Sequence, residues 1–283
     1  MKELDIMRKA ASEASDYAAK ARKTASVSGK GAFDIVTEAD KEAERIIISI
    51  IQKEFPNDAI VAEETSPDES PAFSGHRCWT IDPIDGTWNY ANGVQGYGAQ
   101  IAFIDEGKVI ASVIRIPDYG GVIEAYAQKG KGAYINEFRV VARPKENLLR
   151  TIVLFGCLPA NETKVMDSEL KMIGKIRQNV GMIRMLGASS LAMALVADGR
   201  VDAYVGFSQH LWDRAPGSLI CSEAGCHVLS RKGTWSLADA NIAVAVGTAM
   251  ESVISSSWGE KRRLAVFRSK KRLNSSPSHS IMS

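Results

Sequence analysis

Apolar residues recur at helical spacing in two segments near the start of the chain, and each segment predicts an amphipathic helix. The first helix covers residues 2–24. The second covers residues 37–55, where Thr37 is a candidate N-cap and Pro56 follows the end. Between the two helices, the segment 26–34 contains several glycines and serines and predicts a flexible loop. The buried stripe of the second helix consists of Ala43, Ile46, Ile47, Ile50 and Ile51.

Short apolar runs predict strands in the next part of the chain. The segments "AIVAEE" (59–64) and "RCWTID" (77–82) each predict a strand that ends in carboxylates. Residues 97–143 predict antiparallel strands, with one hairpin turning at Glu106-Gly107 and a second pair joined by a glycine-rich turn.

Helices and strands alternate beyond Pro144. The predicted strands are 151–156, 201–207, "CHVLS" and "NIAVAVG", and the predicted helices are 163–178, 187–199, 213–225 and a closing helix from Thr248. Pro216 should lie in the first turn of its helix, where a missing N–H costs little. Layers of helix pairs and sheets would bury all of these apolar faces, so we expect an α+β fold.

The pattern also predicts how the chain is divided. We expect an N-terminal half at residues 1–143 that carries the antiparallel strands and a C-terminal α/β half at residues 144–267. Residues 268–283 are basic and rich in serine, which predicts a mobile tail outside the core.

Composition and charge exclude several classes of function. Of the 283 residues, 45% are hydrophobic, and a net charge of +2 gives no strongly basic face, so we expect no nucleic-acid partner. The charged first residues lack the apolar stretch of a signal peptide, and no apolar run is long enough for a membrane span. Four scattered cysteines indicate a reduced, cytoplasmic protein, and the group Cys221, Cys226 and His227 fits no common zinc pattern.

Carboxylates stand at the ends of predicted strands and at the start of a predicted helix. If neighbouring strands end at the same edge of a sheet, these groups converge and repel one another unless cations lie between them. Oxygen-only ligands of this kind suit Mg²⁺, with Mn²⁺ as a substitute, and the backbone carbonyl of Ile84 offers a further hard ligand. The carboxylates are Glu63 and Glu64, Asp82 and Asp85, and Asp213.

The residues after Asp85 add a second chemical feature. Gly86 and Thr87 open a short predicted helix whose first N–H groups could bind an anion. A metal site beside an anion site is equipment for phosphoryl chemistry. Each acidic residue alone has a plainer interpretation: Asp85-Gly86 as a turn, Asp213 as an N-cap, and Asp40 as half of a capping box. Their occurrence together, in this order, favours the metal site.

Four motifs of the chain resemble successive signatures of the inositol monophosphatase family. They are "DIVTEAD" (34–40), "AEE" (62–64), "WTIDPIDGTWN" (79–89) and "WDRAPGSLICSEAG" (212–225), and the resemblance runs from about residue 5 to residue 255. It implies a layered α/β/α/β/α sandwich of the sugar-phosphatase type. It also implies a Mg²⁺-dependent phosphomonoesterase that forms a homodimer and binds two to three metal ions.

The resemblance also implies roles for the acidic residues. The first metal ion would be held by Glu63, Asp82 and the carbonyl of Ile84, and the second by Asp82, Asp85 and Asp213. A third, looser ion would lie near Glu63. In this arrangement Asp82 is shared, and the close aspartates are tolerated because they share cations.

The catalytic and substrate residues follow from the same resemblance. The backbone of Gly86 and Thr87 would cradle the phosphate, and the Thr87 hydroxyl, held by Asp40, would orient the attacking water together with Glu63. Asp85 and Asp213 would also face the substrate, beside a segment at the start of a helix formed by Gly187, Ala188 and Ser189.

Gly206 is the main departure from the family pattern. Inositol-hydrolysing members tend to carry a glutamate there that grips ring hydroxyls, so glycine should leave room for a bulkier or positively charged alcohol. We expect inositol 1-phosphate as the leading substrate and histidinol phosphate as the alternative, with fructose bisphosphate and phosphoadenosine phosphate less favoured. A different class, a non-catalytic regulatory protein that keeps the metal and phosphate site, is the second alternative.

Overall fold

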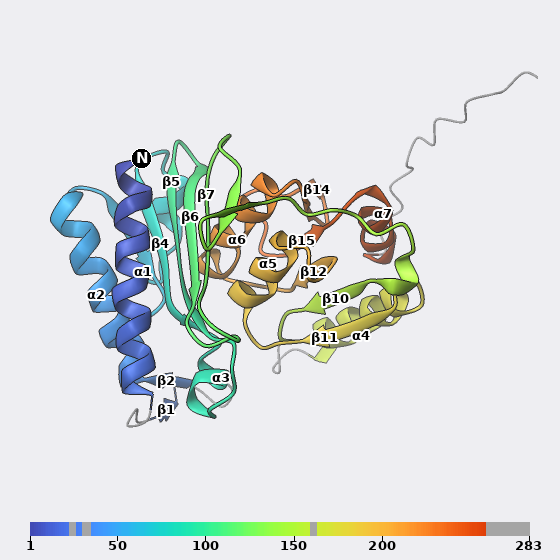
Figure 1. The fold of residues 1–283 in the computed structure, drawn as a ribbon, viewed down its shortest axis with the longest axis horizontal. Helices are drawn as coiled ribbons and strands as arrows, with labels where there is room; N and C mark the ends of the chain where they lie inside the picture. Colours follow the sequence, from blue (N-terminus) through green and yellow to red (C-terminus); the bar gives the residue numbers. More distant parts are fainter. Residues whose placement is uncertain (23–26, 30–34, 159–162, 259–283) are drawn as a thin grey trace, which may run out of the picture.

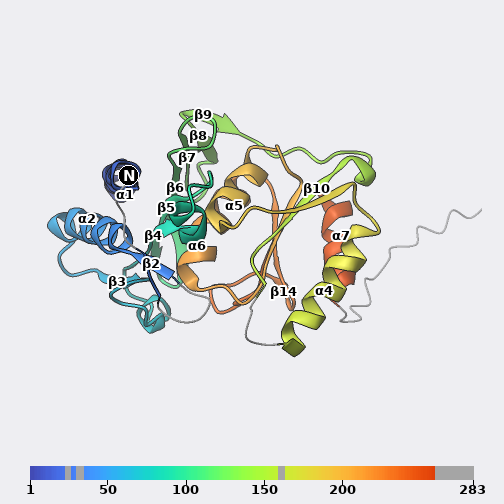
Figure 2. The same cartoon turned by 90° about the horizontal axis from the view of Figure 1, so that it is seen from below.

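Helices and sheets alternate in five layers in the computed structural model, which describes residues 1–22, 27–29, 35–158 and 163–258. Figures 1 and 2 show the order: one helix pair, a sheet, a second helix pair, another sheet, and a third helix pair. The arrangement confirms the predicted α/β/α/β/α sandwich. The outer and central helices are α1 (Lys2–Ala21) with α2 (Glu38–Glu54), α5 (Ser189–Ala197) with α6 (Leu211–Glu223), and α4 (Thr163–Arg177) with α7 (Thr248–Ser257).

The first sheet has seven strands in the order β3-β4-β5-β6-β7-β8-β9. β3 pairs in parallel with β4, and every later neighbour pairs antiparallel. The predicted hairpin at Glu106-Gly107 is confirmed, with φ of 49° and 68° at these residues. The strands are β3 (Ala59–Ala62), β4 (Cys78–Asp85), β5 (Gly98–Asp105), β6 (Lys108–Ile116), β7 (Ile123–Gln128), β8 (Ala133–Ile135) and β9 (Phe138–Val140).

The second sheet has six strands in the order β11-β10-β12-β15-β13-β14. β10 lies parallel to β11 and β12, whereas β15 and β13 continue the sheet antiparallel. The strands are β10 (Ile152–Phe155), β11 (Met182–Met185), β12 (Ala203–Gly206), β13 (His227–Ser230), β14 (Gly233–Thr234) and β15 (Ile242–Ala245). A small ribbon of β1 (Val27–Gly29) and β2 (Ile35–Thr37) lies apart from both sheets.

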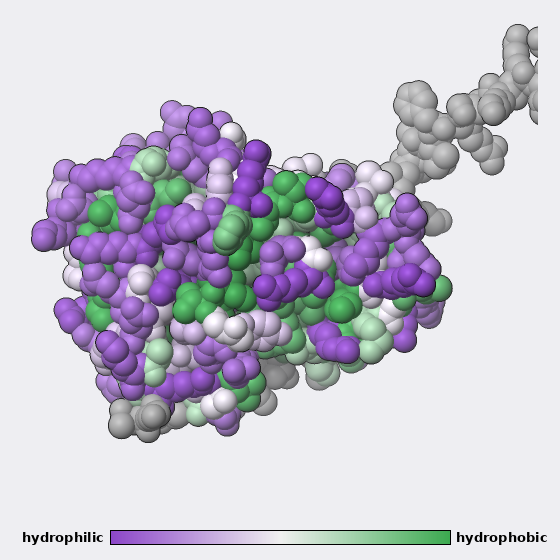
Figure 3. Space-filling view, viewed as in Figure 1, coloured by the Kyte–Doolittle hydropathy of each residue, from purple (hydrophilic) through white to green (hydrophobic). Residues whose placement is uncertain are grey.

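Burial explains why the layers form. One apolar cluster joins α1 and α2 to the seven-stranded sheet, a second surrounds α5 and α6 between the sheets, and a third lies under α4 and α7. Every residue of α5 is buried, because this helix has a sheet on either side. The face seen in Figure 3 is mostly hydrophilic, with hydrophobic residues showing in separate patches. None of the helices in the described ranges has the length and apolar character that a membrane crossing requires.

Two predicted elements need correction. The helix expected at residues 213–225 begins at Leu211, because Leu211 and Trp212 are buried and join its first turn. Pro216 is therefore the sixth residue of the helix and lies in its interior, not in its first turn. Residues 27–29, expected in a flexible loop, pair as a strand with residues 35–37.

Some predictions fall outside the described residues. These are the remainder of the loop 26–34, the end of the helix expected to reach residue 24, and the tail 268–283. The division of the chain at residues 143 and 144 stays a prediction.

Candidate active site

Three aspartates from two elements meet at one end of the first sheet. Asp82 and Asp85 belong to the last part of β4, where the pairing register with β5 shifts. Asp213 is the third residue of α6, in the central layer. One carboxylate oxygen from each residue lies within 4.8 Å of the other two. The strand, the register shift and the helix start therefore bring together three of the five carboxylates that the sequence predicted to converge, and this group of three does not include Glu63 or Glu64.

Asp82 is the most deeply buried member, with 1% of its surface exposed. Its Oδ2 accepts a hydrogen bond from Gln100 Nε2 at 3.2 Å, whereas Oδ1 has no hydrogen-bond partner in the described part of the chain. Burial, followed by the charges of Glu63, Asp85 and Asp213, raises the pKa of Asp82 well above its ordinary value. A buried carboxylate oxygen with no donor and three acidic neighbours fits a divalent cation with oxygen ligands.

Asp85 is held by the start of α5. Its Oδ2 accepts hydrogen bonds from the backbone N–H of Ser190 at 2.6 Å and from Ser189 Oγ at 3.3 Å. Burial raises the pKa of Asp85, and these hydrogen bonds oppose the rise. The helix N-terminus also favours a negative charge at this point. The same Ser189 hydroxyl lies 3.0 Å from the carbonyl oxygen of Asp213, so one side chain ties β4 to α6.

Asp213 is fixed by the helix that contains it. Its Oδ2 accepts the backbone N–H of His210 at 3.0 Å, which anchors the carboxylate at the helix start. Burial and the charge of Asp85 raise its pKa to about 7. In the absence of a cation, this carboxylate therefore takes up a proton near neutral pH.

Thr87 lies between the cluster and α2. Its Oγ1 is 3.4 Å from Oδ1 of Asp40 and 3.2 Å from the carbonyl oxygen of Ile84, so its hydroxyl proton has two alternative acceptors. Asp40 is fully buried although it belongs to the first turn of α2. The structure thus places Thr87 within reach of Asp40, its expected partner, and also of the Ile84 carbonyl, for which the resemblance implied a different role as a metal ligand.

Two glycines allow the loops around the cluster to approach closely. Gly86 has φ of 86° and ψ of 41°, and a Cβ there would lie 3.0 Å from Ala188 Cβ. Gly187 has φ of 76°, and a Cβ there would lie 2.9 Å from Asn89 Oδ1. Beyond Gly86, the short helix α3 (Thr87–Ala91) begins, as predicted, and its first N–H groups have no intrahelical acceptor.

Glu63 follows β3 at the same edge of the sheet. Its backbone N–H donates to the carbonyl oxygen of Ile81 at 3.2 Å, which continues the pairing with β4 by one residue. Its charge contributes to the raised pKa of Asp82. The buried Glu44 of α2 holds the next two residues, because its carboxylate accepts Glu64 N–H at 2.7 Å and Thr65 Oγ1 at 2.6 Å.

A cavity of about 290 Å³ opens beside Asp85 and Asp213. All three residues of the expected substrate segment line it, together with residues from the ends of β10 and β12. The lining comprises Gly187, Ala188, Ser189, Gly156, Cys157, Leu158, Tyr204, Phe207, Ser208 and Gln209.

The expectation of free space at Gly206 is wrong. A Cβ at Gly206 would lie 2.1 Å from Gln209 Oε1 and 3.0 Å from the Tyr204 hydroxyl, so these two side chains fill the space. Gln209 follows Ser208, which has a left-handed φ of 46°, and this turn directs the chain back over the strand end. A local sequence pattern does not reveal such a return.

The sequence also missed Gln100, Ser190 and Glu44. Gln100 contacts Asp82 and Ser189, with Nε2 at 3.2 Å and 3.1 Å from their oxygens. A signal was present for Gln100, since it is the polar residue inside the apolar run "YGAQIAFI" of a buried strand. For Ser190 and Glu44, the sequence carries no comparable signal, because their contacts depend on how the layers pack.

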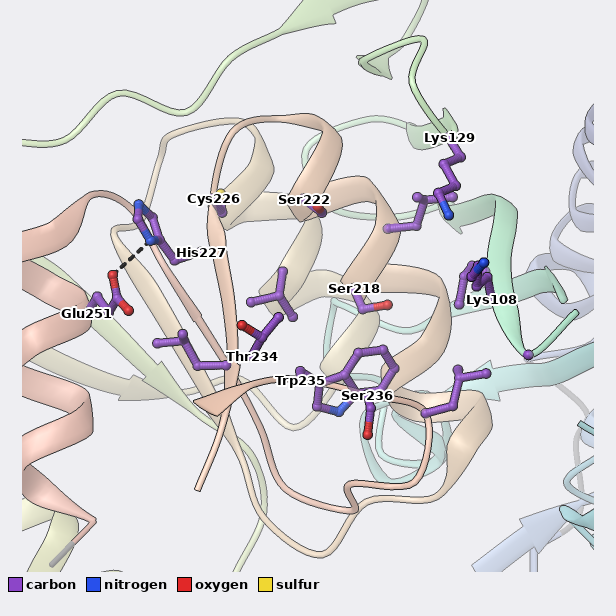
Figure 4. A pocket seen from close by; sticks show the side chains of 16 residues that line it. Lys108, Lys129, Ser218, Ser222, Cys226, His227, Thr234, Trp235, Ser236 and Glu251 are labelled. Carbon is purple, nitrogen blue, oxygen red and sulfur yellow. Dashed lines mark ion pairs between the residues drawn. The ribbon is translucent and has the colours of Figure 1, made fainter. Parts of the chain in front are cut away.

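A larger cavity of about 580 Å³ lies elsewhere, between the β6 hairpin, α6 and β13. In Figure 4, Lys108 and Lys129 stand at one side and the ion pair of His227 with Glu251, 2.8 Å apart, at the other. Among the described residues that line this cavity, Glu251 alone has a carboxylate. The possible metal-binding cluster in the described ranges is the group of Asp82, Asp85 and Asp213, which lies outside this cavity. Size alone therefore does not identify the active site.

Comparisons with known proteins agree with this geometry. The profile of the inositol monophosphatase family matches residues 3–262. A fructose-1,6-bisphosphatase/inositol-1-monophosphatase of Thermotoga maritima is 36% identical over 203 residues, 72% of this chain and 74% of that protein. The Nus factor SuhB of Pseudomonas aeruginosa is 34% identical over 202 residues, 71% of this chain and 73% of that protein. The solved IMPase structure of Thermotoga maritima has a TM-score of 0.80 at 30% identity, covering 91% and 97% of the two chains.

The five layers and the buried aspartate cluster define a protein of the phosphatase type with a site suited to a divalent metal. The chain belongs to the inositol monophosphatase family.

Proposed function

We propose that this protein is a Mg²⁺-dependent phosphomonoesterase that hydrolyses a small polyol monophosphate, with inositol 1-phosphate as the favoured substrate. The observation that carries the proposal is the position of the Thr87–Asp40 pair beside the three aspartates. A metal site alone could stabilise the fold without any catalytic role. A hydroxyl held at that cluster by a buried carboxylate suits the orientation of a water molecule.

The ligands in this proposal are those that the family resemblance implies. Asp82 would be shared by two ions, Glu63 and the carbonyl of Ile84 would complete the first set, and Asp85 and Asp213 the second. A looser third ion would lie near Glu63. Bound divalent cations supply Lewis-acid activation of water and offset charge on the phosphoryl group and the leaving oxygen. The Oδ1 atom of Asp82, which has no hydrogen-bond partner among the described residues, supports its role as the shared ligand.

The side chains of the protein position the reactants. When the Thr87 proton is donated to Asp40, the Thr87 oxygen can accept a hydrogen bond from water and direct a water lone pair toward phosphorus. Glu63 is the base that receives the water proton. The first N–H groups of α3, at Gly86 and Thr87, donate to phosphate oxygens. The alcohol part of the substrate then lies in the cavity lined by Gly187, Ala188 and Ser189.

The alternatives are two further substrates and one role from a different class. Histidinol phosphate is a second candidate substrate, because an acidic cavity suits a cationic alcohol. The relative named fructose-1,6-bisphosphatase/inositol-1-monophosphatase adds a sugar bisphosphate to the set to be tested. Relatives named Nus factor SuhB make a role as a Nus factor the candidate from a different class. The buried Asp40 beside Thr87 favours catalysis, since a binding protein has no need to orient water.

A panel of esters tests the proposal. Phosphate release is measured in Mg²⁺ with inositol 1-phosphate, histidinol phosphate and fructose 1,6-bisphosphate, for wild type, Thr87→Ala and a control. The control is Thr248→Ala, at an exposed position that begins α7. We expect Thr87→Ala to lower kcat by about two to three orders of magnitude, with Mg²⁺ affinity little changed. Turnover at the wild-type rate in Thr87→Ala would show that the hydroxyl does not orient water.

A further inference from the structure

A slot between two glycines holds a pair of polar side chains in the substrate cavity. A Cβ on Gly156 would lie 2.9 Å from the Tyr204 hydroxyl, and a Cβ on Gly206 would lie 3.0 Å from it. The hydroxyl therefore occupies a space that exists because glycine stands at the end of its own strand β12, at Gly206, and just after the neighbouring strand β10, at Gly156. Tyr204 is 1% exposed, yet it lines the cavity together with Asp85 and Asp213.

Gln209 fixes this hydroxyl. Its Nε2 donates to the Tyr204 oxygen at 2.8 Å. The backbone of Gln209 is held at both ends, because its N–H donates to Ala240 O at 2.9 Å and its carbonyl oxygen accepts a hydrogen bond from Arg214. The side chain of Gln209 thus has a rigid base from which it reaches the slot.

The hydrogen bond leaves the Tyr204 proton available. A phenolic oxygen can accept from an amide and still donate its own hydrogen. No acceptor for that hydrogen is found in the described ranges of the chain, and Gln209 Oε1 also has no hydrogen-bond partner there. A buried donor without an acceptor costs free energy unless a ligand or water completes it. The cavity beside Asp85 and Asp213 is where such a ligand would lie.

We propose that Tyr204 donates a hydrogen bond to a hydroxyl oxygen on the alcohol part of the substrate, and that Gln209 is the positioning residue that orients it. The inference rests on the proposed phosphatase function and names its substrate class. The pair selects polyol monophosphates over phosphate esters that carry no free hydroxyl. The pair occupies the place that a side chain at position 206 would fill, so specificity arises from Tyr204, two residues earlier on the same strand, and from Gln209, three residues later.

The effect of Tyr204→Phe on three phosphate esters distinguishes a hydrogen bond to the substrate from a purely structural role of Tyr204. Inositol 1-phosphate and glycerol 2-phosphate carry free hydroxyls, whereas ethyl phosphate carries none. We expect Tyr204→Phe to lower kcat/KM for the two polyol esters by about three- to tenfold, the scale of one neutral hydrogen bond, mainly through KM. For ethyl phosphate, the change should stay below about twofold. The matched control is Tyr126→Phe, whose hydroxyl donates to Glu137 outside the cavity and should change none of the three values.

Two further variants address the role of Gln209. Gln209→Met keeps the size of the side chain but cannot donate, and it should give the same polyol-selective loss in weaker form. Gly206→Ala places a methyl group where Gln209 Oε1 now lies and should reproduce that loss. Its control is Gly174→Ala in α4, where an added Cβ meets no atom of the described residues within 4 Å.

The outcomes are distinguishable. Equal losses on all three esters, or no loss on any, would overturn the role of Tyr204 while the phosphatase stands. A wild type that turns over none of the three in Mg²⁺ would overturn the proposed function, and this inference with it.

Discussion

Asp82→Asn should abolish activity and yet stabilise the metal-free protein. In the structure, Asp82 accepts a hydrogen bond from Gln100 through Oδ2, while Oδ1, beside acidic neighbours, has no donor among the described residues. Asparagine keeps an oxygen for Gln100 and places an NH₂ group where the unpaired oxygen lies. The substitution thus removes one negative charge and adds a donor toward Asp85 and Asp213, at almost unchanged volume.

The size of the effect follows from the spacing of the carboxylates. At a separation of 4.8 Å and an effective dielectric constant of about 20, two full negative charges repel by about 3.5 kcal/mol. The raised pKa values mean that the cluster is partly protonated, which reduces this figure. We therefore expect a gain of about 1–3 kcal/mol in the free energy of unfolding at pH 8, or roughly 2–4 °C in Tm per kcal/mol.

Metal should reverse the ranking of the two proteins. At a Mg²⁺ concentration of about 1,000 times Kd, binding stabilises the wild type by about 4.1 kcal/mol, which exceeds the expected advantage of the variant, and the variant loses most of this gain. The control is Asp202→Asn, because Asp202 is buried but has a cation partner, with Lys145 Nζ at 2.8 Å. This variant should lose stability with or without Mg²⁺.

The assay is thermal unfolding in EDTA and in Mg²⁺, repeated across pH. A carboxyl group whose pKa is higher in the folded state than in the unfolded state lowers the stability of the fold as pH rises between the two pKa values. For Asp213 this window runs from about pH 4 to about pH 7. The advantage of Asp82→Asn in EDTA should therefore fade as pH falls through this window. A variant that is less stable than wild type in EDTA at pH 8 would refute the account of mutual repulsion.

Three further predictions concern the metal, its support and the assembly. Mg²⁺ affinity, measured by titration calorimetry, should weaken as pH falls below about 7, because Asp213 must lose a proton to bind the ion. An affinity that stays unchanged between pH 8 and pH 5.5 would contradict this. Ser189→Ala should weaken Mg²⁺ affinity by about tenfold or more, since Ser189 contacts Asp85 and the Asp213 carbonyl. Ser112→Ala should not, because its buried hydroxyl has no hydrogen-bond partner in the described part of the chain. In analytical ultracentrifugation we expect a homodimer, with the half-exposed Met182 and Met185 of the edge strand β11 as part of its interface, and a monomer at micromolar concentration would refute this.

Much of the fold could be predicted because its signals are local. The apolar stripe of α2 and the hairpin at Glu106-Gly107 each lie within a short segment. The hairpin is present, and of the stripe Ala43, Ile47 and Ile51 are buried, whereas Ile46 and Ile50 are partly buried. The strand β11 escaped prediction because its four residues, "MIRM", show no alternation and three of them are exposed. Pro216 was misplaced because burial of Leu211 and Trp212 extends the helix at its start, and a helix propensity does not contain that tertiary effect.

The acidic cluster was visible in the sequence for a similar reason. Asp82, Asp85 and the glycine after them form one continuous motif, so their proximity follows from the chain itself. Asp213 was a candidate because it stands at a predicted helix start, but its proximity to the other two aspartates depends on packing between layers, which the local sequence does not contain. The position of the Gln209 side chain could not be predicted from the sequence. Whether Gly206 leaves a space depends on a side chain that returns to it through a left-handed residue.

The central claim is that the aspartate cluster binds a divalent cation required for phosphate-ester hydrolysis. The most direct test is phosphate release from inositol 1-phosphate by protein stripped with EDTA, as Mg²⁺ is added back. We expect no release without metal and a saturable rise with Mg²⁺, which Asp85→Asn and Asp213→Asn abolish. Release that is unaffected by EDTA, or that persists in both variants at the wild-type rate, would contradict the claim.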